Sequence, residues 1–281
     1  MVSPLTIALA YSGYLALLAP VWPWVARRRL ARAPRDATRA GQAGWPWLRV
    51  ALGEAGAAAC ALLMVLAERP RTPWVLAEAL LPAAALLVGY WASGLFYVAP
   101  MPRVERALHA LDRRLRVPEI ARRAPPAVAD VLEAAYVAVY PLTLVGLVLY
   151  LILSPAADPD RFWTLVLATD FACFGCLPWI QTRTPRAFEP GDPWRSRLRP
   201  LNLLIVHRAS IQVNTFPSGH TAEALAIALL MLEAGPWAFA ALVAVAAAIS
   251  AGAVLGRYHY LADAVAGYFV ALGVWIVVTP R

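Results

Sequence analysis

The sequence predicts an all-α fold, a polytopic membrane helical bundle of about eight transmembrane helices. The chain has 281 residues, of which 61% are hydrophobic and 15% are charged. An ordinary soluble domain is nearer to roughly 45–50% apolar and about 25% charged. The apolar residues gather in separate runs, and a helix that spans a bilayer needs roughly 20 mostly apolar residues. Composition and segmentation therefore both favour a membrane protein with several spans.

Apolar runs follow one another along the chain, and tryptophans lie near many of their ends, where interfacial anchors are expected. The runs are Leu5–Ala26, Leu48–Ala67, Val75–Val98, Val128–Leu153, Phe162–Ile180, Ala222–Leu232, Trp237–Leu255 and Leu261–Val278. The run Ala222–Leu232 is short for a span. We therefore expect it to extend towards His220 and Ala234, to tilt, or to be buried among neighbouring helices.

The first run, Leu5–Ala26, is expected to be a retained helix. No basic residue precedes it, and Arg27, Arg28 and Arg29 follow it directly. A secretory signal has the opposite order of charge and a cleavage site of small residues.

Basic residues concentrate in two connectors, Arg27–Arg49 and Met101–Pro126. The formal net charge is +8, and all 25 basic residues are arginines. Membrane topology and anionic headgroups explain arginines between apolar runs, so no nucleic-acid partner is expected. Four apolar residues of the second connector share one helical face and predict an amphipathic interfacial helix. They are Val104, Leu108, Leu111 and Leu115.

Three polar segments fall on one side of the membrane if all eight runs span it. They are Gln181–Arg186, Pro217–Thr221 and Arg257–Asp263. The first of them also begins the longest non-hydrophobic stretch, which ends at Phe216, and long irregular loops are usually functional or disordered. We therefore expect one site at one interface.

The segment Pro217-Ser218-Gly219-His220 has the features of an anion site. Ser218 and Gly219 can present backbone N–H groups at the start of the sixth helix, where free donors and the positive end of the helix dipole favour an anion. His220 would lie beside that anion. The alternative is a Pro-Ser-Gly helix cap with an incidental histidine.

His259 and Asp263 are four residues apart and share a face if the segment is helical. The carboxylate can then accept the imidazole N–H and fix its tautomer, which leaves the other ring nitrogen as a directed nucleophile or base. The alternative is a histidine at a helix start with a capping or snorkelling aspartate.

Arg183 and Arg186 follow the fifth run directly, and a planar guanidinium with several donors suits phosphate oxygens. The alternative is that these arginines only mark the membrane boundary. His220, His259 and Asp263 could in principle supply three zinc ligands. The spacing of the His–Asp pair better suits a carboxylate–histidine unit, so we expect no metal and no other cofactor.

Together, Pro217-Ser218-Gly219-His220 and the later His259-x-x-x-Asp263 resemble the type-2 phosphatidic acid phosphatase superfamily. That family has the pattern K-x6-R-P, then P-S-G-H, then S-R-x5-H-x3-D, on a six-helix membrane core. The resemblance covers roughly residues 75–281. It implies a phosphatase-like core there, with residues 1–74 as two additional N-terminal helices and a basic connector.

By position, the resemblance implies that His259 is the nucleophile and forms a phosphohistidine, and that Asp263 orients and activates it. It implies that His220 protonates the leaving lipid oxygen and then assists the attack of water. Ser218 and Gly219 would bind phosphate oxygens. Enzymes of this family need no metal.

The first family motif is not matched as written, because the chain has no lysine. Its arginine is best placed at Arg183 or Arg186, directly after the fifth run. The pair Arg199-Pro200 matches the letters R-P but lies far from the ends of the predicted helices, so it is the second choice.

The Ser-Arg pair of the third motif falls on Gly252 and Ala253, and Arg257 is the nearest substitute. We therefore include Arg257 among the phosphate-binding candidates. These departures lean towards the divergent branch that includes lipid phosphotransferases such as inositol phosphorylceramide synthases.

The expected function is an integral-membrane phosphatase that hydrolyses a lipid phosphomonoester or pyrophosphate through a phosphohistidine. The alternative is a lipid phosphotransferase, in which an alcohol replaces water at the same His/His/Asp site. A transporter or scaffold is a third class, since Glu54, Glu78 and Asp170 lie inside apolar runs. The expected partners are a lipid phosphate and the surrounding membrane lipids.

The expected location is a bacterial-type cytoplasmic membrane. The positive-inside rule places both basic connectors in the cytoplasm, and with eight spans the site faces the same side. Proteins that this chain resembles usually act on the outer face, so either one run does not span the membrane or the orientation is inverted here, and both alternatives stay open.

Overall fold

The structure is a computed structural model that describes residues 2–31, 46–67, 75–189, 195–211 and 213–279. Over these residues the regular elements are helices, and the only β-type pairing is an isolated bridge between Thr182 and Asn214. The prediction of an all-α fold is therefore confirmed. The elements are α1 (Pro4–Leu18), α2 (Trp22–Leu30), α4 (Pro46–Ala67), α5 (Val75–Gly94), α6 (Pro102–Arg114), α7 (Val117–Arg123), α8 (Pro126–Leu153), α9 (Pro159–Cys176), η1 (Pro185–Ala187), α10 (Arg199–Ala209), α11 (Gly219–Leu230), η2 (Met231–Ala234), α12 (Pro236–Leu255) and α13 (Leu261–Val278).

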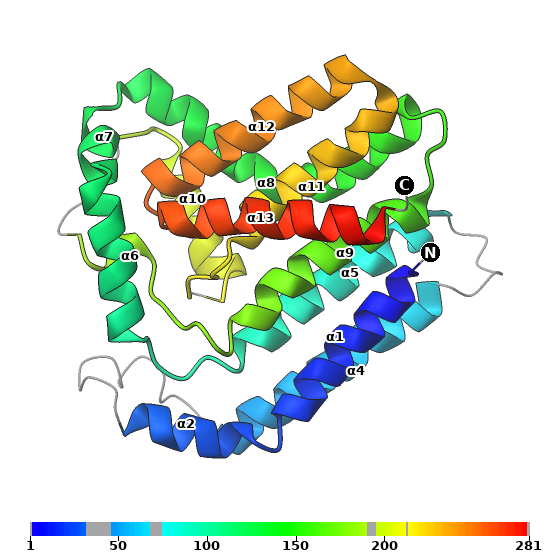
Figure 1. Ribbon diagram of the computed structural model, residues 1–281, viewed down its shortest axis with the longest axis horizontal. Coiled ribbons are helices and arrows are strands. Elements are labelled where there is room, and N and C mark those ends of the chain that lie inside the picture. Colours follow the sequence, from blue (N-terminus) through cyan, green and yellow to red (C-terminus); the bar gives the residue numbers. More distant parts are fainter. Residues whose placement is uncertain (1, 32–45, 68–74, 190–194, 212, 280–281) are drawn as a thin grey trace.

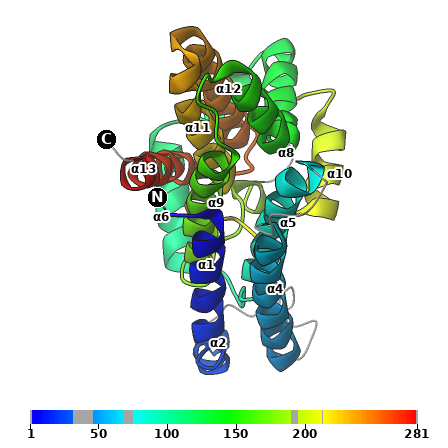
Figure 2. The same ribbon diagram turned by 90° about the vertical axis from the view of Figure 1, so that its right-hand side faces the viewer.

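Helix α11 is the central element of the fold. It contacts α8, α9, α12 and α13, which surround it in Figures 1 and 2. Side chains on all sides of α11 are buried, among them Ala222, Glu223 and Ile227. The expectation that the short sixth run is extended and buried is confirmed. The helix begins at Gly219 and continues through η2 as far as Ala234.

The N-terminal helices form a layer against α5 and α9 (Figure 1). The Tyr11 ring of α1 stacks on Phe171 of α9 with 4.2 Å between centroids, and its hydroxyl donates to the carbonyl of Gly89 at 3.0 Å. The hydroxyl of Ser12 donates to the carbonyl of Ala57 in α4 at 2.7 Å. The boundary that we place at residue 75 stays a prediction.

Three helices of the described chain, α8, α12 and α13, are long and apolar enough to cross a membrane. The pair α1 and α2 makes a fourth span if it counts as one, and shorter apolar segments cover Ala51–Ala67 and Leu80–Gly94. These helices fit a membrane protein. The count of about eight spans stays a prediction.

The first apolar run is not one continuous helix, so the prediction of a single helix over Leu5–Ala26 is wrong in this respect. The axes of α1 and α2 differ by 60°. Pro20 lies in the break, and proline interrupts a helix because it has no N–H to donate and its ring clashes with the preceding turn.

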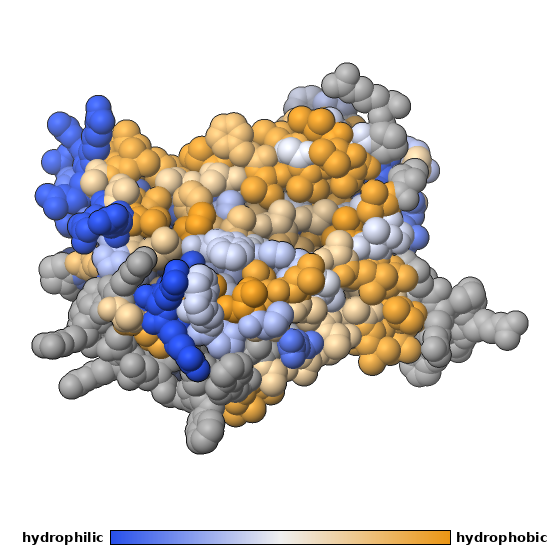
Figure 3. Space-filling model, turned by 60° about the horizontal axis from the view of Figure 1, so that its bottom comes forward, coloured by the Kyte–Doolittle hydropathy of each residue, from blue (hydrophilic) through white to orange (hydrophobic). Residues whose placement is uncertain are grey.

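The connector Met101–Pro126 is helical, as expected, but it forms two helices. Arg116 lies between α6 and α7 with a φ of 57°, which ends the first helix. Leu108 is buried, whereas Leu111 and Leu115 are exposed beside exposed arginines. Figure 3 shows apolar surface across the middle of one face and strongly hydrophilic side chains at the end where α6 and α7 lie. The other basic connector falls largely outside the described residues.

Candidate active site

Backbone hydrogen bonds of the three segments, or of residues directly before them, and one shared cavity bring together the segments that we expect on one side of the membrane. The N–H of Asn214 donates to the carbonyl of Thr182 at 3.0 Å, and the N–H of Ser218 donates to the carbonyl of Asp263 at 3.0 Å. Residues of all three segments line one cavity of about 270 Å³, including Arg186, His220 and His259. The expected convergence on one site is therefore confirmed.

The start of α11 is tightly packed and has a buried hydroxyl. Ser218 is the N-cap, and its Oγ is buried with no hydrogen-bond partner among the described residues. A Cβ on Gly219 would lie 2.9 Å from the ring of Phe174, so only glycine lets the helix start approach α9 this closely. The first N–H groups of a helix have no partner within it, and they leave an anion site at this point.

His259 lies in the bend before α13 rather than on the helix, which corrects the geometry that we predict for the His–Asp pair. Its Nδ1 is still 3.4 Å from Oδ2 of Asp263, within ion-pair distance but outside hydrogen-bond geometry. Asp263 is completely buried, and its Oδ2 accepts from the N–H of Tyr260 at 2.8 Å and from Nδ2 of Asn214 at 2.9 Å. The carboxylate is therefore fixed beside Nδ1, and Nε2 is the nitrogen left to react.

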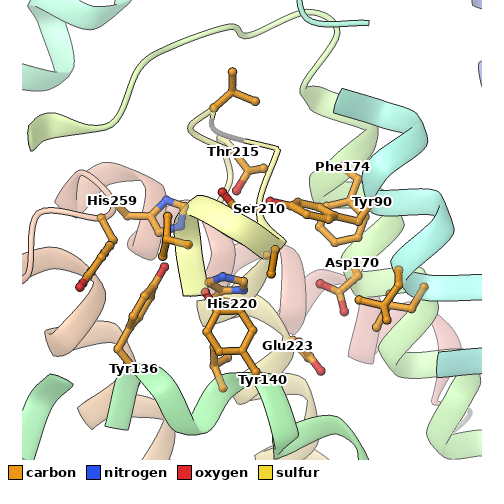
Figure 4. Close-up of a pocket in the computed structure, with 18 of the residues that line it drawn as sticks. Tyr90, Tyr136, Tyr140, Asp170, Phe174, Ser210, Thr215, His220, Glu223 and His259 are labelled. Carbon is orange, nitrogen blue, oxygen red and sulfur yellow. The ribbon is translucent and has the colours of Figure 1, made fainter. Parts of the chain in front are cut away.

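His220 faces His259 across the cavity (Figure 4). The two ring centroids are 6.0 Å apart, and the ring planes meet at 84°. Tyr136 and Tyr140 of α8 contact His220 at centroid distances of 5.6 and 5.7 Å. The two imidazoles are thus close enough to act on a single group between them.

Arg186 is the arginine that the fold brings to the cavity. It lies in η1, lines the cavity and sits 5.0 Å from the ring centroid of Tyr258. Its Nη1 is buried with no hydrogen-bond partner among the described residues. Burial lowers the pKa of Arg186, although an arginine stays protonated at any ordinary pH. A partly buried cation that has no acid partner among the described residues is well suited to bind an anionic ligand.

Two other arginine candidates are held by carboxylates away from the cavity. Arg183 donates from Nε and Nη2 to Glu105 at 3.1 and 3.0 Å. The side chain of Arg257 is fully buried and pairs with Asp112 at 2.6 Å and with Glu189 at 2.7 Å. Burial alone would lower the pKa of Arg257, but the hydrogen bonds to Glu189 and Asp112 raise it. Neither arginine lines the cavity, which departs from the phosphate-binding role expected for them.

Arg199, our second choice for the first motif, begins α10 and supports the loop of His259. Its Nη1 donates to Glu133 at 3.0 Å and to the carbonyl of Gly256 at 2.7 Å. Tyr258 donates to the same Glu133 and stacks on Tyr136 with 4.2 Å between centroids. These contacts position the chain directly before His259.

Several residues of the site lie outside the sequence motifs. Asn214, Tyr136 and Tyr140 contact the His–Asp pair or His220, and no local sequence pattern marks them. Asp170 lines the cavity, whereas Glu54 is exposed on α4 and the side chain of Glu78 lies outside the described residues. Over the described chain, no group of three or more His, Cys, Asp or Glu residues is arranged to hold a metal ion.

A sequence model of the PAP2 superfamily, the type-2 phosphatidic acid phosphatases, matches residues 99–277. The match covers more than half of the chain, including both histidines and the aspartate of the site. Comparisons with curated proteins and with solved structures found no match. The chain therefore belongs to the PAP2 superfamily, as its motifs indicate, and this membership supports a phosphatase-type enzyme.

Proposed function

We propose that this PAP2 superfamily member is an integral-membrane phosphatase that hydrolyses a lipid phosphomonoester or pyrophosphate through a phosphohistidine. The observation that carries the proposal is the cavity in which His259 and His220 face each other beside Arg186. Arg186 has no acid partner among the described residues and would attract the phosphate. His259 on one side can attack phosphorus, and His220 on the facing side can protonate the leaving oxygen.

The first step forms the phosphoenzyme. Nε2 of His259 attacks phosphorus while the bond from phosphorus to the lipid oxygen breaks. His220, which the bound anionic phosphate would hold in its protonated form, gives its proton to that oxygen. The lipid alcohol leaves, and the phosphoryl group stays on His259. Asp263 lies beside Nδ1 and stabilises the positive charge that develops on the ring.

The second step releases phosphate. His220, now neutral, accepts a proton from water as the water oxygen attacks phosphorus and the bond from phosphorus to Nε2 breaks. The products are inorganic phosphate and the starting enzyme, with His220 again protonated. Throughout both steps, Arg186, the Ser218 hydroxyl and the first N–H groups of α11 would bind the phosphoryl oxygens.

The apolar wall of the cavity supports a lipid substrate. Leu86, Leu87 and Trp91 of α5 and Val139 of α8 line it beside the polar groups. A pocket with an apolar wall and a few polar groups at one end suits a molecule that has an anionic head and a hydrocarbon chain.

The test is phosphate release in detergent from a panel of lipid phosphates, with wild type and His259→Ala side by side. The panel holds phosphatidic acid, phosphatidylglycerol phosphate, a polyprenyl pyrophosphate and a phosphorylated sphingolipid. We expect release by the wild type only, with unchanged folding of the variant. Equal release by both proteins would overturn the proposal.

Lipid phosphotransfer is the second candidate function, because an alcohol can replace water in the second step. This chain has Gly252 and Ala253 where the family pattern has Ser and Arg, and this departure supports phosphotransfer as the alternative. The products distinguish the two reactions: a new phosphodiester after addition of an acceptor alcohol identifies a transferase, whereas inorganic phosphate alone identifies a phosphatase.

A further inference from the structure

Two buried carboxylates line the active-site cavity, and the reaction above uses neither. Asp170 comes from α9 and Glu223 from α11, and their exposed fractions are 1% and 7%. Figure 4 shows both side chains on the same side of His220. Buried acids inside a membrane segment are costly and usually functional.

The acid pair lies directly beside the expected phosphate position. Glu223 is three residues after His220, so the two side chains are neighbours on α11. Oδ1 of Asp170 is 3.2 Å from the position that a Cβ on Gly219 would take, at the start of the same helix. If the phosphate of a ligand binds at the helix start, a short chemical group attached to that phosphate can therefore reach both carboxylates.

No cation of the described chain neutralises these acids. Oδ2 of Asp170 is buried and has no hydrogen-bond partner, and Glu223 accepts from the hydroxyl of Thr143. The two acids also interact electrostatically with each other. A positive group on the ligand would give both carboxylates a charge partner, which a plain phosphate does not supply.

Aromatic rings surround the acid pair. Tyr90 and Phe174 lie with their ring centroids 5.2 Å apart and line the cavity beside Asp170, and Tyr140 lines it beside Glu223 (Figure 4). Aromatic faces attract ammonium groups, and carboxylates accept their hydrogen bonds. A polyol headgroup would use the carboxylates but would gain little from the aromatic faces, so these surroundings favour an amine.

We infer that the ligand of this cavity carries a primary ammonium separated from its phosphate by a short alkyl spacer, and that Asp170 and Glu223 bind this ammonium. The inference rests on the proposed function, since it assumes that the phosphate lies between His220, His259 and Arg186. The amine can belong to the lipid itself, as in a long-chain 2-amino alcohol phosphate, or, in the phosphotransferase reaction, to a phosphoethanolamine headgroup.

Ligand binding tests the inference without turnover. Binding of phosphoethanolamine, glycerol 3-phosphate and inorganic phosphate to full-length His259→Ala, which cannot form the phosphoenzyme, is measured in detergent by calorimetry or thermal shift. We expect phosphoethanolamine to bind at least tenfold more tightly than glycerol 3-phosphate. Asp170→Asn/Glu223→Gln should remove this preference, with inorganic phosphate still bound. The control Glu233→Gln, at the far end of the same helical segment, should keep the preference.

Turnover separates this inference from the proposed function. A long-chain 2-amino alcohol phosphate is compared with its N-acetyl derivative, which lacks the positive charge. If kcat/KM is higher for the long-chain amino alcohol phosphate than for phosphoethanolamine, the amine belongs to the lipid. If kcat/KM is higher for phosphoethanolamine, the amine belongs to the headgroup. Hydrolysis of amine and N-acetyl substrates at equal rates, or equal binding of amine and glycerol phosphates, would overturn the inference alone. Amine-selective binding without any phosphate release would instead overturn only the phosphatase.

Discussion

Arg183 and Arg186 lie three residues apart, but among the described residues Arg183 is paired with a carboxylate and Arg186 is not. Nη2 of Arg183 is 3.0 Å from Oε2 of Glu105, whereas Nη1 of Arg186 is buried without a hydrogen-bond partner in the described chain. A buried guanidinium without a counterion is costly in free energy, and a bound anion relieves that cost. Of the two arginines that the sequence predicts at the same interface, Arg186 is therefore the one that we propose for the phosphate.

Replacement of Arg186 tests this difference. Arg186→Ala should lower kcat/KM by about 100- to 1,000-fold, because the transition state loses a charged hydrogen-bond donor. Arg186→Lys should recover part of the loss, since it keeps the charge and loses the planar fork. Arg183→Ala is the matched control: we expect lower thermal stability, because Glu105 loses its partner, and a much smaller effect on kcat/KM. Equal losses in kcat/KM for both alanine variants would count against the assignment.

The second prediction concerns Asp263. Asp263→Asn should lower kcat by about 100- to 10,000-fold with the fold preserved, because His259 loses the negative charge beside Nδ1 that stabilises the cation formed on the ring. Steady-state kinetics and a thermal unfolding curve measure the two effects. Asn214→Ala should produce a smaller loss, since it removes only one hydrogen bond to Oδ2 and leaves the negative charge. An Asp263→Asn variant with nearly normal kcat would show that the carboxylate is dispensable.

The third prediction concerns stability. Arg257→Leu should lower the free energy of unfolding by about 3–5 kcal/mol, because removal of the shared cation leaves Asp112 and Glu189 buried and uncompensated. Thermal or denaturant unfolding in detergent measures the change. A loss below about 1 kcal/mol would mean that the ion-pair network contributes little.

The pH dependence of the same variant follows from Asp112. Burial raises the pKa of this carboxyl above its usual value of 3.8, although Arg257 opposes the rise. Without Arg257 the pKa should rise further. The folded state then binds the proton more tightly than the unfolded state, so stability falls as pH rises above 3.8 and through the folded-state pKa. The deficit of Arg257→Leu should therefore shrink on acidification, and a deficit that grows would contradict this reasoning.

The fourth prediction concerns the close approach of Gly219 to α9. Gly219→Ala should destabilise the protein by about 1–3 kcal/mol, because the new Cβ would lie 2.9 Å from Phe174. It should also lower activity, since it moves the start of α11 relative to His259. Gly273→Ala is the control, because no atom lies within 4 Å of its Cβ position. Unfolding curves and kcat/KM are measured for both variants. Equal stability and equal kcat/KM would show that the close packing of Gly219 against Phe174 does not matter.

The histidines, their aspartate and the convergence of three segments follow from the sequence. The motif around His220 marks a helix start, and His259 lies directly before the next turn and Asp263. The number of helices between the polar segments predicts that all of them lie at one interface, and the structure brings them to one cavity. These features depend on short sequence motifs and on whether an even or odd number of helices separates them, and both can be read from the sequence.

The role of each arginine depends on partners from distant segments. Arg183 and Arg257 are bound by Glu105 and Asp112 of α6, more than seventy residues away in sequence. Their spacing cannot distinguish a paired guanidinium from a free one. For the same reason no local pattern identifies Asn214, which reaches Asp263 only in the folded chain.

The most direct test of the proposed mechanism is detection of the phosphoenzyme. Wild type and His259→Ala are mixed with a lipid phosphate that carries a radiolabelled phosphoryl group, quenched within one turnover and digested. We expect acid-labile, base-stable label on the peptide that contains His259 in the wild type, and no label in the variant. Rapid hydrolysis by the wild type without label, or with label on another residue, would contradict a phosphohistidine at His259.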